Sequence, residues 1–134
     1  MSWNVGDEAS LSKTITGEDI RRFADLLGDH NPIHVDEEYA RTTPFGRPLA
    51  HGMLVASLVS SVLASRMPGP GTVYLGQDLR FKAPVFSGDT ITAKAVVREI
   101  RADKPIYTLE TVCVNQNGET VITGQAVVLW RGEA

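Results

Sequence analysis

The sequence lacks the features that would place the chain in several large classes of protein. It has a single cysteine, Cys113, so no disulfide can form within the chain, and this fits a reducing compartment such as the cytoplasm. The first residues carry neither a basic segment nor an apolar run, so we expect no signal peptide. The longest apolar stretch, residues 49–64, is too short to cross a bilayer. We therefore expect a cytoplasmic protein that does not enter a membrane.

The chain also lacks an excess of positive charge. Its 13 Lys and Arg residues stand against 16 Asp and Glu residues, which gives a net charge of −3. Nucleic-acid binding depends on basic side chains that neutralise phosphates, so we expect no nucleic-acid partner. The sequence has no Cys-x-x-Cys spacing, no His-Glu-x-x-His spacing and no glycine-rich phosphate-binding pattern. These absences predict that the protein holds neither a metal ion nor a nucleotide cofactor.

The first half of the chain carries helix signals. Thr16 is placed to cap a helix that ends at Gly28, and an edge strand is expected before it at residues 9–15. Residues 29–36 are expected to be irregular because Pro32 blocks helix continuation, although Asp36 can cap a short helix over residues 37–41. A longer helix is predicted from about Gly52 to residue 66. Its apolar residues lie on most faces, so we expect it to be buried nearly all round.

The second half of the chain predicts four strands. Apolar and polar residues alternate within residues 73–81, 91–97, 106–114 and 121–129. Asn117 followed by Gly118 predicts a two-residue hairpin turn between the last two strands. We expect an α+β fold in which an antiparallel sheet packs on one long apolar helix, and the length of 134 residues fits a single domain spanning residues 1–134.

Asp29 and His34 form the constellation that can carry chemistry. They lie five residues apart on either side of Pro32, and His51 stands in the second proline-containing loop. A carboxylate and an imidazole around one water can divide proton transfer between them. The spacing also allows a structural interpretation, in which Asp29 bonds loop N–H groups and the two histidines pack. His30 is expected to be exposed, and Cys113 is expected to be a small buried residue.

Two motifs resemble those of the MaoC-like, (R)-specific enoyl-CoA hydratases, including the type that supplies polyhydroxyalkanoate synthesis. Residues 29–34 read DHNPIH and residues 47–53 read RPLAHGM, and the likeness continues through YLGQ at 74–77 and LRFKAPV at 79–85. The resemblance covers nearly the whole chain. It implies a hot-dog fold, a homodimer with active sites near the interface, and an acyl-CoA thioester as substrate. No separate cofactor is implied, because coenzyme A is part of the substrate.

The resemblance also implies roles for individual residues. Asp29 and His34 match the catalytic pair that holds the water added to the β-carbon, in an overall syn addition. Gly52 matches the residue whose backbone N–H polarises the thioester carbonyl, and a helix N-terminus suits that role. We expect Asp29 to hold His34 in one tautomer and the acyl chain to be short to medium. The substrate-binding positions implied are Asn31, His51, Met53 and Ser60.

Other functions fit the same sequence features. A hot-dog acyl-CoA thioesterase would direct water at the thioester carbonyl, and an acyl-carrier-protein dehydratase would act on a different carrier. A non-catalytic acyl-CoA-binding module would use the fold without turnover. A purely structural partner protein is disfavoured, because it does not explain two polar clusters that flank one apolar helix.

Overall fold

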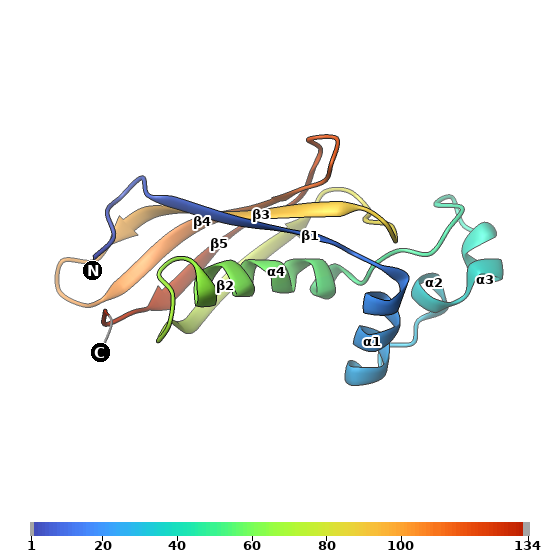
Figure 1. Cartoon of the computed structure of the whole chain (residues 1–134), viewed down its shortest axis with the longest axis horizontal. Coiled ribbons are helices and arrows are strands. Elements are labelled where there is room, and N and C mark those ends of the chain that lie inside the picture. Colours follow the sequence, from blue (N-terminus) through green and yellow to red (C-terminus); the bar gives the residue numbers. More distant parts are fainter. Residues whose placement is uncertain (1, 133–134) are drawn as a thin grey trace.

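The computed structural model describes residues 2–132, in which one sheet wraps around one long helix (Figure 1). None of the helices described there is long and apolar enough to cross a membrane. In chain order the elements are β1 (Glu8–Thr14), α1 (Gly17–Leu27), α2 (Pro32–Val35), α3 (Glu37–Arg41), α4 (Gly52–Ser65), β2 (Val73–Phe81), β3 (Thr90–Ile100), β4 (Ile106–Val114) and β5 (Thr120–Leu129).

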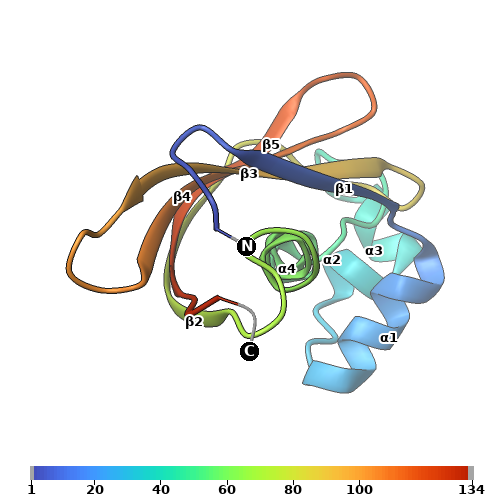
Figure 2. The same cartoon turned by 60° about the vertical axis from the view of Figure 1, so that its left-hand side comes forward.

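The sheet is antiparallel throughout, with the strand order β1-β3-β4-β5-β2. The strands β1 and β2 therefore form its two edges. Register shifts between Tyr74 and Gly76 and between Val97 and Glu99 interrupt the ladders, and such bulges increase bending. The sheet curves around α4, which lies on its concave side (Figure 2). This arrangement confirms the predicted α+β class and hot-dog architecture.

The core lies between the inner face of α4 and the sheet. Alternate side chains of each strand point toward the helix, as the period-2 pattern predicts. The expectation that α4 is buried nearly all round is wrong for the single chain, because the sheet covers only one side and the exposed side carries serines and Met53. The buried residues of α4 are Val55, Ala56, Leu58, Val59, Val62 and Leu63, and they pack with strand residues such as Ile91, Ala93, Leu109, Cys113, Val121 and Val128.

The segment between α1 and α3 is more regular than the sequence predicts. Pro32 was expected to block helix continuation, but it occupies the first position of the short helix α2. Its missing N–H costs no hydrogen bond at that position. The side chain of Asn31 caps this turn by accepting from the Ile33 N–H at 3.2 Å. Asp36 caps α3 as predicted, accepting from the Tyr39 N–H at 3.1 Å.

The β4–β5 connection lies where the sequence predicts a hairpin, but its turn type differs. The Gly118 N–H donates to the Asn115 carbonyl at 3.0 Å, and the Asn115 N–H donates to the Glu119 carbonyl at 2.9 Å. Gly118 has a positive φ of 78°, whereas no non-glycine residue among residues 2–132 has one. A two-residue turn of the expected type needs positive φ at both central residues, so Asn117 instead belongs to a three-residue loop.

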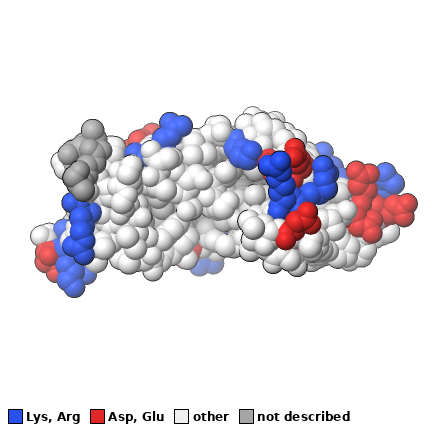
Figure 3. Space-filling view, turned by 60° about the horizontal axis from the view of Figure 1, so that its bottom comes forward, with Lys and Arg blue, Asp and Glu red and all other residues white. Residues whose placement is uncertain are grey.

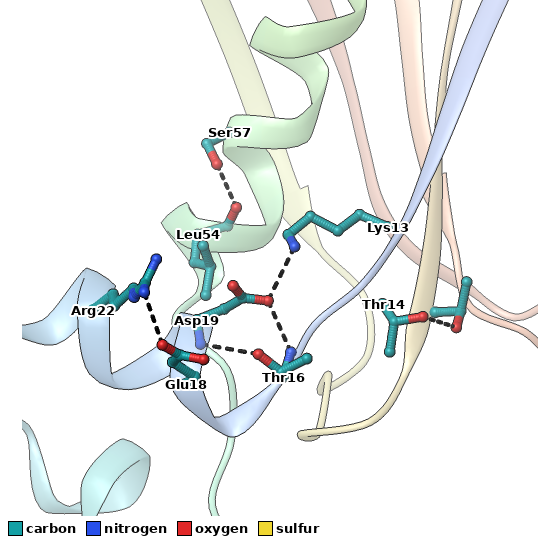
Figure 4. Close-up of polar contacts among 9 residues, drawn as sticks. Lys13, Thr14, Thr16, Glu18, Asp19, Arg22, Leu54 and Ser57 are labelled. Carbon is teal, nitrogen blue, oxygen red and sulfur yellow. Dashed lines mark hydrogen bonds and ion pairs between the residues drawn. The ribbon is translucent and has the colours of Figure 1, made fainter.

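Reciprocal hydrogen bonds fix the start of α1, as predicted from Thr16 (Figure 4). The Thr16 hydroxyl accepts from the Asp19 N–H at 3.1 Å, and the Asp19 carboxylate accepts from the Thr16 N–H at 3.0 Å. Lys13 lies 3.1 Å from the same carboxylate. The Thr16 N–H, helped by Lys13, holds the pKa of Asp19 below its usual value. The cap anchors the first turn of α1, the helix that ends just before Asp29.

We predict that Thr16→Ala lowers the free energy of unfolding by about 1 kcal/mol, since one helix N–H loses its acceptor. Urea denaturation followed by circular dichroism measures the change. Thr16→Ser keeps the hydroxyl and should stay close to the parent protein. Equal losses in both variants would contradict the capping role.

Candidate active site

Asp29 lies immediately after the C-terminal cap of α1. Gly28 has left-handed backbone geometry, with φ of 76°, and ends the helix as the sequence predicts. The N–H groups of Gly28 and Asp29 both donate to the Ala24 carbonyl, at 2.8 and 3.1 Å. These bonds turn the chain so that the Asp29 carboxylate stands free of the helix in an exposed position.

His34 lies on α2, and its ring is fixed by the backbone of a distant loop. Its Nδ1 lies 2.8 Å from the Leu49 carbonyl. A carbonyl can only accept a hydrogen bond, so Nδ1 carries the proton and Nε2 keeps a free lone pair. The tautomer of His34 is therefore set by Leu49. The expectation that Asp29 sets it is corrected, because the bond goes to a carbonyl that no sequence motif indicates.

The structure brings the predicted pair together. One ligand atom from each of Asp29, His34 and His51 lies within 4.8 Å of the other two. This spacing lets one water bond both the carboxylate and the free His34 nitrogen. A base and an acid that share one water can activate it as a nucleophile and return its proton elsewhere.

The same three residues are of types that bind metal ions, but the ring geometry opposes a shared ion. The rings of His34 and His51 stack with their centroids 3.9 Å apart and their planes 27° apart. A histidine nitrogen binds a metal ion that lies in the plane of its ring. In two stacked rings, an ion in the plane of one ring lies well out of the plane of the other, so both cannot bind the same ion well. The cluster is better suited to proton transfer than to metal binding.

A cavity of about 360 Å³ opens beside His34 and Gly52. Its walls are mainly apolar, with Lys82 as the charged residue, and such walls suit an acyl or pantetheine chain. Most of this wall lies within the motifs at residues 29–34, 47–53 and 79–85, but sequence reasoning gave a cavity role to few of these residues, because their meeting depends on the fold. Besides His34 and Gly52, the lining consists of Phe45, Leu49, Ala50, Val55, Phe81, Lys82, Ala83, Pro84, Val85 and Ile122.

Gly52 is the first residue of α4, so its N–H belongs to the turn that lacks intrahelical acceptors. A methyl group added at Gly52 would lie 2.8 Å from Cε1 of Phe81 and 3.1 Å from Cδ1. Any larger residue at position 52 would therefore require the Phe81 ring to shift. The position combines a free donor, a helix N-terminus and a cavity wall.

The remaining predicted residues fall into two groups. Asn31 stands next to the pair, and its N–H lies 3.4 Å from the Asp29 carboxylate, while His51 is buried behind His34. Met53 and Ser60 instead line a second hollow of about 390 Å³ between α4 and β2. Neither lines the first cavity, so their predicted role in substrate binding stays a prediction.

Two residues set aside from the sequence behave as expected. Cys113 is fully buried, and burial raises the pKa of its thiol to about 11, so it stays protonated at neutral pH. His30 is exposed and lies 2.9 Å from the exposed Asp25 carboxylate. Neither residue belongs to the site.

Comparison with known proteins assigns the chain to a family. Residues 5–118 match the family model described as the MaoC-like domain, so the chain belongs to that family. An (R)-specific enoyl-CoA hydratase from Aeromonas caviae is 50% identical over 127 residues, covering 95% of each chain. One from Rhodospirillum rubrum is 49% identical over 124 residues, covering 92% of this chain and 85% of that protein.

A solved structure supports the same assignment. The (R)-hydratase from A. caviae involved in polyhydroxyalkanoate biosynthesis superposes with a TM-score of 0.93 at 49% identity. The match covers 96% of this chain and 97% of that one. The family resemblance of the two sequence motifs is therefore confirmed.

We predict that Gly52→Ala lowers kcat by about 10- to 100-fold, because the methyl group displaces Phe81 and misplaces the N–H. Steady-state kinetics with an enoyl-CoA measures the change. Adding Phe81→Leu removes the clash and should restore activity toward that of Phe81→Leu alone. Activity of Gly52→Ala within twofold of the parent protein would contradict the close-approach argument.

Proposed function

We propose that this protein is an (R)-specific enoyl-CoA hydratase, which adds water reversibly to a trans-2-enoyl-CoA and forms an (R)-3-hydroxyacyl-CoA. The observation that carries the proposal is the Asp29–His34 pair beside an apolar cavity whose wall includes Gly52. The high identity to curated hydratases along nearly the full chain supports the reaction type.

In the proposed reaction, Asp29 and the free Nε2 of His34 hold one water between them. The water oxygen bonds to the β-carbon of the enoyl group while one of its protons passes to the pair. The pair then delivers a proton to the α-carbon on the same face, so hydrogen and hydroxyl add syn. The reverse sequence removes water, and each residue ends in its starting protonation state.

Negative charge develops on the thioester oxygen as the β-carbon is attacked. The Gly52 N–H, at the start of α4, donates to that oxygen, and the helix dipole favours the charge. A donor of this kind lowers the barrier by about 3–4 kcal/mol in other enzymes. No further cofactor is required, because the thioester itself provides the acceptor for the charge.

The substrate's remaining parts fit the cavity's chemistry. Apolar walls contact the acyl and pantetheine chains, and Lys82 offers a cation toward the coenzyme phosphates. Arg66 and Arg80 also carry positive charge but do not line this cavity. We propose short to medium acyl chains as substrates, and a cytoplasmic location consistent with the single buried thiol.

We also propose a homodimer that forms through β2. The edge strand β1 is mainly polar, whereas the edge strand β2 exposes large apolar side chains. Much of the face in Figure 3 carries no charge over its middle, and charged side chains gather toward its ends. An open apolar edge is a template for pairing with another strand. The exposed apolar residues on and beside β2 are Val73, Tyr74, Leu75, Phe81 and, at the start of α4, Met53.

The hydratase proposal is tested with crotonyl-CoA. We expect loss of enoyl absorbance without release of free thiol, and a product of the (R) configuration in chiral analysis. Asp29→Asn and His34→Gln should each lower kcat by about 100- to 10,000-fold, because each removes one partner in proton transfer.

The chain supplies a matched control for this experiment. Asp25 and His30 have the same residue types and spacing in the same region, but their contact is exposed. Asp25→Asn and His30→Gln should therefore retain full activity. Thiol release would instead support a thioesterase, turnover only with acyl-carrier-protein substrates would support a dehydratase, and binding without turnover would support an acyl-CoA-binding module.

The dimer proposal is tested by light scattering coupled to size-exclusion chromatography. The parent protein should elute with twice the chain mass, and Leu75→Lys should shift it toward the monomer by placing charge in the interface. Leu26→Lys is the matched control, since Leu26 is exposed on α1, away from β2. A monomeric parent protein would contradict the proposal.

A further inference from the structure

His51 is the most enclosed polar side chain near the site. Only 2% of its surface is exposed, although it occupies the N-cap position of α4, where most polar side chains bond the helix N–H groups. Its side chain makes no such capping bond. The ring is also absent from the lining of the cavity beside His34. Its role therefore needs an explanation other than capping or direct contact with the substrate.

The hydrogen bond of His51 goes to the backbone of a catalytic residue. Its Nε2 lies 2.9 Å from the Asp29 carbonyl, so Nε2 carries the proton and donates. Within residues 2–132, Nδ1 is the buried side-chain atom left without a hydrogen-bond partner. A buried polar atom without a partner destabilises the fold, and such atoms call for a functional explanation.

The two faces of the His51 ring contact residues from different helices. His34 of α2 stacks at 3.9 Å, and Phe23 of α1 lies against the ring at 4.8 Å with a 53° tilt. The ring therefore joins three separate parts of the chain. It holds the Asp29 backbone through its edge and the His34 imidazole through its face.

We propose that His51 is a positioning residue that sets the Asp29–His34 geometry through its hydrogen bond to the Asp29 carbonyl. The carbonyl follows the helix end at Gly28, and this bond ties the Asp29 backbone to the residue that precedes α4, in addition to the bonds that Gly28 and Asp29 make to Ala24. The stack packs the His51 ring against His34, whose direction is set by its hydrogen bond to the Leu49 carbonyl. The kinetic test of this proposal rests on the hydratase function, whereas a second test by chemical shifts does not.

The kinetic test separates the hydrogen bond from the packing. His51→Phe keeps the aromatic face and loses the donor, whereas His51→Gln keeps a donor near the position of Nε2 and loses the face. We expect His51→Phe to lower kcat by about 10- to 100-fold with KM within about twofold, since small misplacement of reacting groups is costly. His51→Gln should recover most of that loss. His30→Gln, at an exposed histidine, is the control and should leave both constants unchanged.

A second readout does not depend on turnover. The ¹⁵N chemical shift of the Asp29 amide should move in His51→Phe and return toward the parent value in His51→Gln. If His51→Phe does not fold, His51→Leu serves as the donorless variant.

The possible results lead to distinct conclusions. Three results would overturn the proposal. The donorless variant could keep the parent kcat, or it could show a raised KM with kcat unchanged. His51→Gln could also be as impaired as the donorless variant. An unchanged chemical shift of the Asp29 amide would overturn it as well, even if the parent protein proves to lack hydratase activity. Lack of activity in the parent with the expected change in chemical shift would contradict the proposed function and leave the positioning role supported.

Discussion

The geometry of the site depends on a short stretch of backbone, Leu49 and Ala50, that is hydrogen-bonded on both sides. The Leu49 N–H donates to the Ile33 carbonyl at 3.0 Å, and the Leu49 carbonyl accepts from His34. The Ala50 N–H donates to the Val85 carbonyl at 2.7 Å. This stretch ties α2 to the segment after β2 and leads directly into His51 and Gly52. His34 and Gly52 thus share one backbone support.

The fold separates rigidity from chemistry. The curved sheet and α4 form the packed core, and the polar residues of the site lie at the end of α4 where α1, α2 and α3 gather (Figure 1). Functional groups on loops gain precision when a rigid scaffold fixes the loop ends. Here the N-terminus of a core helix provides one end of the site, and a capped helix end provides the other.

Local signals made much of this arrangement predictable. Thr16 and Gly28 act on their own neighbouring N–H and carbonyl groups, so the sequence defines both ends of α1. The strands followed from alternation, and the spacing around Pro32 indicated that Asp29 and His34 could lie close together, as they do. The hairpin at Asn117 and Gly118 was wrong in type because its register depends on the pairing of β4 with β5, where the ladder shifts at Val114.

Features that depend on tertiary contacts could not be predicted in the same way. The partner of His34 is a backbone carbonyl 15 residues away, which side-chain patterns do not identify. The cavity wall joins Phe45, Val55 and Phe81 from separate segments. The motif indicated that His51 matters, but its contacts with Phe23 and Asp29 are visible only in the folded chain.

The close approach of Phe81 to Gly52 has an electrostatic consequence. The Phe81 ring takes up space beside the first residue of α4 that water would otherwise fill. Where water is excluded, the local dielectric constant falls, and a hydrogen bond to a growing negative charge becomes stronger than it is in bulk solvent. Phe81 can thereby strengthen the hydrogen bond that the Gly52 N–H donates. The ring can lie this close because residue 52 has no side chain.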